Sequence, residues 1–164
     1  NVRASEECDV TLSRDGQLTM QGQNITSCTL TPTAQGINAS RSQTATRNTA
    51  LDAGSGDLDL RQAKLDATDQ LEARSSGSLL NDGGTLSGKN VDLNARSIAN
   101  REGNLVVGKR LDVKAAVLSG EGKILSEGDL RANLPQGFTN QSQVLANGDL
   151  TTPRVGRVDY QVQL

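Results

Sequence analysis

Apolar residues recur along this chain at intervals of about 20 residues, and they fall into three columns. The first column holds Val10, Leu30, Leu51, Leu71, Val91, Leu111, Leu130 and Leu150. The second holds Leu18, Leu58, Leu79, Ile98, Leu118, Phe138 and Val158. The third holds Ile25, Ala45, Leu65, Leu86, Leu105, Ile124 and Val144. A period shared by three columns predicts a repeat architecture in which each coil stacks on the next.

Residues around each column alternate between apolar and polar, as in Leu58-Asp59-Leu60. This period of two is typical of half-buried strands. Connections between parallel strands are right-handed in nearly all proteins. We therefore predict an all-β fold, a right-handed single-stranded parallel β-helix with about 20 residues and three short strands per coil, and about eight coils over the 164 residues. The columns should face inward over at least residues 50–150.

Competing folds account for the pattern less well. The apolar residues do not follow helical spacing, and 17 glycines are too many for helix interiors. No row shows the motif of a leucine-rich repeat. Antiparallel hairpins would not keep glycines in phase along the whole chain.

Glycine and asparagine follow the same period. One glycine column holds Gly88, Gly108, Gly128 and Gly148, and another holds Gly16, Gly36, Gly56 and Gly77, resumed at Gly137 and Gly156. Glycine at a constant phase predicts turns with positive φ. Near one turn we expect a ladder of Asn81, Asn100 and Asn140, with Ser119 in the equivalent place. Stacked amides can hydrogen-bond along such a ladder, and asparagine is also a good turn residue.

The regularity varies along the chain. We expect irregular N-terminal coils over 1–50, regular repeats over 51–150 and a C-terminal edge or tail over 151–164. After Thr152 the segment has a proline and no matching Asn-Gly turn. Residues 1–12 show no signal peptide, so an exported protein would contain this chain as an internal piece.

Composition agrees with a thin core of uniform aliphatic layers. The chain has no Trp or His and only one Phe, one Tyr and one Met. Its net charge of −2 gives no reason to expect nucleic acid as a partner. No run of 18 apolar residues exists, so no membrane insertion is expected.

The rows from Leu71 onward resemble a known family. They read LEARSSGSLLNDGGTLSGKN, VDLNARSIANREGNLVVGKR and LDVKAAVLSGEGKILSEGD. This pattern is similar to the haemagglutinin repeat, and the residues that carry the match are Asn81, Gly84, Leu86, Gly88, Asn100, Gly103, Leu105 and Gly108. The repeat occurs in filamentous haemagglutinins and in the toxin-delivery proteins of contact-dependent growth inhibition. Both groups are two-partner secretion exoproteins of Gram-negative bacteria, and the match is good over 51–150.

The resemblance implies a role as well as a fold. Such proteins leave the cell through an outer-membrane two-partner secretion transporter and form a long filament at the bacterial surface. The expected function is a structural or adhesive shaft segment of a secreted exoprotein, with a host or bacterial cell-surface receptor as its expected partner. An alternative is a receptor-binding segment, for which the non-repeating residues 1–50 would be the place.

A second alternative is a fragment of a carbohydrate-active enzyme, since such enzymes also use the parallel β-helix. Glycosidases need two carboxylates that face one cleft. The sequence lacks aromatic platforms for sugar rings, and it lacks His, the commonest general base. We therefore predict that the chain is not an enzyme, with no catalytic residue, cofactor or metal ligand.

One acidic pattern is a candidate cation site. Asp52, Glu72, Asp92 and Asp112 have equal phase, so they should form an outward ladder. Ca²⁺ prefers carboxylate oxygens. Exposed charges are nevertheless the default on a strand face, and nearby Arg74 and Lys114 would relieve the repulsion.

The two cysteines lie one repeat apart. Cys8 and Cys28 have the same offset as Val10 and Leu30. Equivalent residues on stacked strands have Cα atoms roughly 4.8 Å apart, which lies within the roughly 4.4–6.8 Å that a disulfide accepts. We predict a Cys8–Cys28 disulfide, and the alternative is a stacked pair of reduced thiols.

Overall fold

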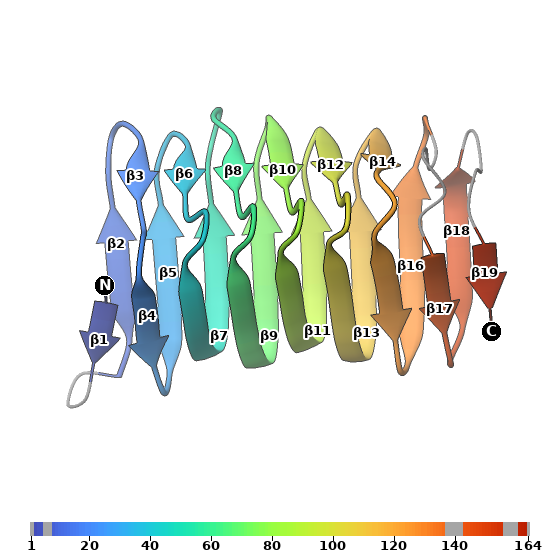
Figure 1. The fold of residues 1–164 in the computed structure, drawn as a ribbon, viewed down its shortest axis with the longest axis horizontal. Helices are drawn as coiled ribbons and strands as arrows, with labels where there is room; N and C mark the ends of the chain where they lie inside the picture. The colour runs from blue at the N-terminus through green and yellow to red at the C-terminus, as the bar shows by residue number, and fades with distance from the viewer. Residues whose placement is uncertain (1, 5–7, 137–142, 156–160, 164) are drawn as a thin grey trace.

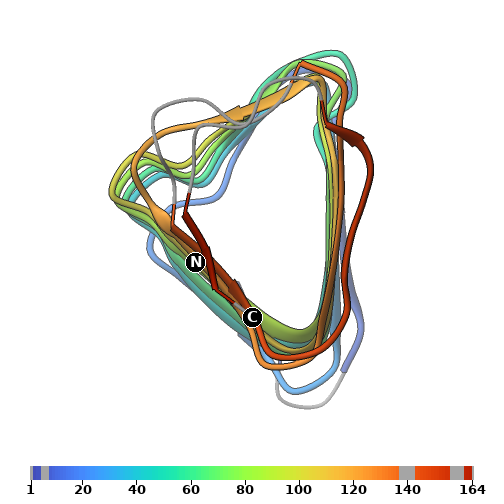
Figure 2. The same cartoon turned by 90° about the vertical axis from the view of Figure 1, so that its right-hand side faces the viewer.

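The structure is a computed structural model that describes residues 2–4, 8–136, 143–155 and 161–163. These residues form 19 strands and no helix. No segment among them could cross a membrane as an apolar helix. Every strand pairing in this part of the chain is parallel. The chain winds into a row of coils from the N-terminus to the C-terminus (Figure 1), and the coils are triangular in section (Figure 2). The predicted right-handed parallel β-helix is confirmed.

Each coil has three faces. The first face contains β2 (Val10–Ser13), β5 (Thr29–Thr33), β16 (Asp129–Leu134) and β18 (Leu150–Val155). The second face contains β3 (Leu18–Thr19), β6 (Ile37–Asn38), β8 (Leu58–Asp59), β10 (Ser78–Leu80), β12 (Ser97–Ala99) and β14 (Val117–Ser119). The third face contains β1 (Val2–Ala4), β4 (Gln23–Thr26), β15 (Lys123–Ser126), β17 (Gln143–Ala146) and β19 (Gln161–Gln163).

Four long strands cross the corner between the third and first faces. They are β7 (Gln43–Asp52), β9 (Lys64–Arg74), β11 (Thr85–Asn94) and β13 (Asn104–Lys114). Their pairing shifts register at the corner, for example between Gly88 and Asn90. Each coil therefore has the three predicted sides. In the middle coils a single long strand forms both the third and the first side. Among the described residues the second face has six stacked strands, whereas the first face has eight, from β2 to β18, in agreement with the eight coils expected from length.

The apolar columns form the core from β9 onward. On the first face Leu71, Val91 and Leu111 stack in register and are at most 1% exposed. Leu58, Leu79, Ile98 and Leu118 do the same on the second face. Burial of each such side chain contributes about 1.5–3 kcal/mol. Phe138 and Val158 lie outside the described residues.

The predicted register was wrong on the first face before β9. Leu30 pairs with Thr49, and Thr49 pairs with Leu71, so Thr49 occupies the place predicted for Leu51. Leu51 is still buried, but it lies in the next inward column, opposite Ala73.

The predicted register was also wrong on the third face, here by one residue. Asn24 and Thr44 point inward in register with Leu65, whereas Ile25 and Ala45 point outward, and Ile25 is 43% exposed. Side chains alternate across a strand, so a one-residue shift moves each of them to the other face.

Positive φ occurs mainly at a different turn from the predicted one. It follows the second face, in a column with φ of 79° at Gly22, 59° at Arg41, 57° at Gln62, 66° at Gly83 and 54° at Glu102. Only two members of this column are glycine, so the left-handed turn was hidden from a search for repeated glycine.

Gly88, Gly108, Gly128 and Gly148 do not have positive φ, which corrects the prediction for them. The four glycines also do not form one column. Gly88 pairs with Val107, so it is out of register with Gly108. Gly128 and Gly148 are required by close packing instead, since a Cβ on either would overlap the backbone of the preceding coil. In the other glycine column only Gly36 has positive φ among the described residues, and Gly137 and Gly156 lie outside them.

Candidate functional site

Asparagine lies inside the coil at the corner after the second face. Asn81 and Asn100 are 0% exposed, and Nδ2 of Asn81 donates to Oδ1 of Asn100 across 2.8 Å. The same inward position in the preceding coil holds Leu60, so a polar ladder begins at Asn81. Asn140, the third predicted member, lies outside the described residues.

The predicted place of Ser119 in this ladder is wrong by one residue. Ser119 pairs with Ala99, so Gly120 takes the position after Asn100. Glycine has no side-chain amide, and the described part of the ladder is therefore a single pair.

The repeat glycines Gly84 and Gly103 belong to the same turn. The amide of Gly84 donates to the carbonyl of Asn81, and that of Gly103 donates to the carbonyl of Asn100. A Cβ on Gly84 would lie 2.6 Å from Oδ1 of Asn81, closer than real Cβ contacts. The Asn-x-x-Gly spacing is thus a packing relationship, in which glycine leaves room for the asparagine side chain.

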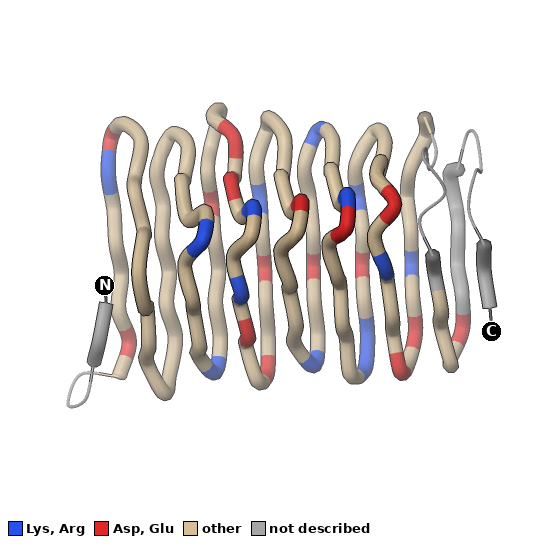
Figure 3. Tube along the Cα trace, viewed as in Figure 1, with Lys and Arg blue, Asp and Glu red and all other residues tan. Residues whose placement is uncertain are grey.

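A short acidic ladder stands on the outside of the first face. Glu72, Asp92 and Asp112 are in register on β9, β11 and β13. The prediction that Asp52 joins them is wrong, because Ala50 lies opposite Glu72 and Asp52 lies opposite Arg74. Figure 3 shows the three acidic positions followed by a basic one along this face.

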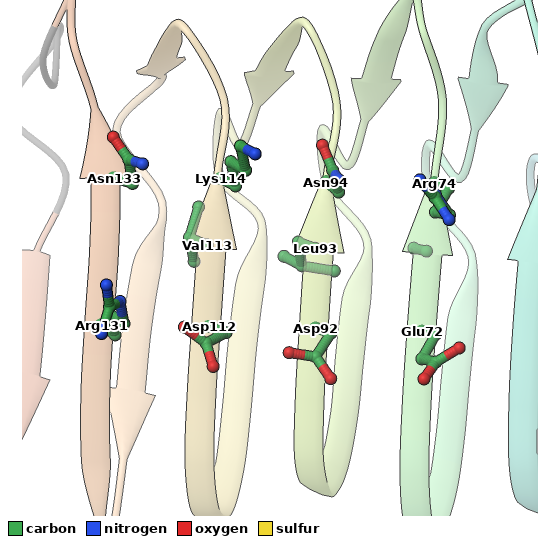
Figure 4. Close-up of a pocket in the computed structure, with 11 residues that line it drawn as sticks. Glu72, Arg74, Asp92, Leu93, Asn94, Asp112, Val113, Lys114, Arg131 and Asn133 are labelled. Atoms are coloured by element: carbon green, nitrogen blue, oxygen red, sulfur yellow. The ribbon is translucent and has the colours of Figure 1, made fainter.

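A shallow open groove of about 490 Å³ runs along the rod beside this ladder. Arg131 follows Asp112 in the acidic column. The neighbouring outward column holds Arg74, Asn94, Lys114 and Asn133. Figure 4 shows the two rows side by side, one residue from each on successive coils. Acidic and basic side chains therefore line the same groove.

Two of the three groove carboxylates lie near a guanidinium group. Arg110 approaches both Asp92 and Asp112, with nitrogen–oxygen distances of 3.8 Å each. Among the described residues no three His, Cys, Asp or Glu side chains converge as a metal site would require. The geometry suits a solvated polar surface, and it lacks the closed oxygen cage that Ca²⁺ coordination uses.

The tightest ion pair of the described residues lies on the second face. The guanidinium of Arg61 donates from Nη2 to Oδ2 of Asp59 at 2.7 Å and from Nε to Oδ1 at 2.9 Å. These hydrogen bonds hold the pKa of Asp59 below its usual value, against the opposing effect of partial burial. The Asp-x-Arg spacing next to a turn is visible in the sequence, but we did not predict this pair from it.

The predicted disulfide is present. Cys8 and Cys28 are bonded, with Cα atoms 5.0 Å apart. Val10 pairs with Leu30 two residues further on, which confirms the equal phase used to predict the bond.

No protein-family model matches the chain, and no solved structure matches it. Two relatives do. The tRNA nuclease CdiA-2 of Burkholderia pseudomallei (strain 1026b) is 38% identical over 80 residues, which is 48% of this chain and 3% of that protein. The toxin CdiA of Yersinia pestis is 28% identical over 137 residues, which is 81% of this chain and 4% of that protein.

This chain therefore spans only a small part of the length of these relatives. The similarity and the β-helix agree with the family expected from the repeat. The chain is thus similar to the CdiA toxins, which are secreted and surface-exposed exoproteins of two-partner secretion, and this similarity supports the family resemblance that its repeat implies.

Proposed function

We propose that this chain acts as a non-catalytic shaft segment of its exoprotein, a rigid spacer in an adhesin or a toxin-delivery filament. The observation that carries the proposal is the register of β7, β9, β11 and β13, which pair in parallel along their whole length apart from the shift at the corner. Each coil buries its inward side chains against the next, so stacking transmits stiffness along the rod.

The surface supports the same role. The groove on the first face is open and lined by both charges, with its carboxylates standing outward on successive coils. Glycosidase chemistry needs two carboxylates across one cleft. Export through an outer-membrane transporter, and contact of the filament with a surface receptor, belong to the same proposal.

A deletion of one whole coil tests the spacer role. Thr85 and Asn104 are equivalent, so removal of residues 85–103 joins Gly84 to Asn104 in register. In the full-length exoprotein we expect this variant to be displayed on the cell surface and to keep its adhesive or growth-inhibiting activity. A control deletion of residues 85–94 removes about half a coil, and we expect it to abolish display.

A different outcome favours the alternative, a receptor-binding segment. If the one-coil deletion is displayed on the cell surface but no longer supports cell contact, the deleted residues make specific contacts.

We also propose the division into irregular coils over 1–50, regular repeats over 51–150 and an edge over 151–164. The polar interior before β9 supports the first boundary of this division.

A further inference from the structure

The interior of the rod is polar in the coils nearest the disulfide. Asn24, Thr26, Thr44, Thr46 and Thr49 point inward and are at most 5% exposed. From β9 onward the equivalent positions are mostly aliphatic, as at Leu65, Leu86 and Leu105 on the third face and at Leu71, Val91 and Leu111 on the first. Less apolar surface is therefore buried between the early coils, and they are held together less strongly.

The polar interior is joined directly to the disulfide by Thr26. Its hydroxyl donates to the carbonyl of Cys8 and accepts from the amide of Cys28 at 3.3 Å. Two residues earlier, Nδ2 of Asn24 makes a long 3.4 Å bond to Oγ1 of Thr44. Oδ1 of Asn24 is buried without a protein partner among the described residues. Buried polar atoms without a partner also occur in later coils, at Asn81, Asn100 and Asn133, so the early coils differ mainly in the small apolar area of their interior.

The disulfide lies within reach of solvent. Cys8 is exposed and Cys28 is half-buried. Thiol–disulfide exchange needs access of a thiolate to one sulfur. A soluble dithiol can therefore attack the bond while the rod is folded. One thiolate displaces a cysteine sulfur and forms a mixed disulfide, and the second thiol then closes the reagent into a disulfide. The protein gains two thiols, with two electrons and two protons.

We propose that the Cys8–Cys28 bond and the polar layer beneath it form a redox-sensitive joint. When the bond is intact, β2 and β3 are fastened to β5 and β6. Reduction by a dithiol releases β2 and β3, while β9, β11 and β13 stay folded on their aliphatic interior. The joint is closed in oxidising surroundings and open in reducing ones. This inference is independent of the proposed shaft function.

Hydrogen exchange measured by mass spectrometry tests the joint on the 164-residue chain, oxidised and in dithiothreitol. The amides of Leu18 and Met20 bond to carbonyls on the next coil, so they report release of β3. Loss of the loop-closure restraint should speed their exchange by about a hundredfold. Amides of β9, β11 and β13 should exchange at unchanged rates. Equal exchange in both states, or faster exchange in all strands, would overturn the proposal.

Two variants distinguish the contribution of the disulfide from that of the polar layer beneath it. Cys8→Ser/Cys28→Ser should show the released pattern without reductant, and full protection in this variant would contradict a role for the bond. Asn24→Val/Thr44→Leu gives the layer an aliphatic interior like that at Leu65. In dithiothreitol its β3 amides should exchange less than tenfold faster than in the oxidised chain. If the β3 amides of this variant exchange in dithiothreitol as fast as those of the unmodified chain, the polar layer plays no part in the joint. Protection in β9 to β13 verifies folding in each sample.

Discussion

The side-chain amide of Asn81 donates to Oδ1 of Asn100 on the next coil, and both residues are fully buried. We expect Asn81→Ala to lower the free energy of unfolding by about 2 kcal/mol, because it opens a cavity and leaves the buried Oδ1 of Asn100 without this donor. Urea denaturation measures the loss. The control is Asn90→Ala, on an outward position of β11, which should change stability by less than about 0.5 kcal/mol. Equal effects of the two substitutions would contradict the importance of the ladder.

Gly84 should be intolerant of a side chain although its φ is not positive. A Cβ would lie 2.6 Å from both Oδ1 of Asn81 and the carbonyl of Leu60. We expect Gly84→Ala to cost about 1–3 kcal/mol through overpacking, as measured by thermal or urea denaturation. Gly16→Ala is the matched control, since nothing lies within 4 Å of its Cβ position, and it should be neutral or slightly stabilising. A neutral Gly84→Ala would show that the corner relaxes easily.

The buried hydroxyls of Thr46 and Thr49 hydrogen-bond to each other at the corner of β7. Thr49→Val alone leaves the Thr46 hydroxyl without this partner, so it should cost about 1 kcal/mol. Thr46→Val/Thr49→Val removes both polar groups at nearly constant shape, and the double variant should be as stable as the parent or more so. A double-mutant cycle from urea melts measures the coupling. Additive single effects would show that the two hydroxyls act independently.

The ion pair between Asp59 and Arg61 should make stability depend on pH in the acid range. The hydrogen bonds from Arg61 lower the folded pKa of Asp59, whereas the unfolded value is about 3.9. The stabilisation is present above the unfolded pKa and is lost as pH falls through the lower folded pKa. At pH 7 we expect Asp59→Asn to lower Tm by about 1–2 °C.

The difference in Tm between Asp59→Asn and the parent should disappear in strongly acidic buffer. Asp15→Asn, an exposed substitution in the turn after β2, is the control and should leave Tm unchanged at both pH values. A destabilisation of the same size in acid would mean that lost packing of the side chain, and not its charge, is responsible.

The sequence alone determined the architecture and much of the interior. From β9 onward, identical aliphatic layers repeat with little change, so the columns through Leu71, Val91 and Leu111 could be read directly. The Cys8–Cys28 bond was predictable for the same reason, since an equal phase on adjacent coils places two Cα atoms at disulfide distance. The Asn-x-x-Gly spacing was visible too, but its meaning as a packing relationship was not.

Only the tertiary structure decided the register of the early coils and the position of the turns. Successive coils on the second face differ by 21, 19 and 20 residues between Leu58, Leu79, Ile98 and Leu118. A corner absorbs one residue without disturbing the strands, yet one residue exchanges the inward and outward side of a strand. That exchange placed Asn24 and Thr44 inside. A shift of two residues on the first face moved Asp52 out of the acidic ladder and left it on the outside. Positive φ at Arg41 and Gln62 was equally unreadable, because backbone conformation there is imposed by stacking of the turns and not by the residue type.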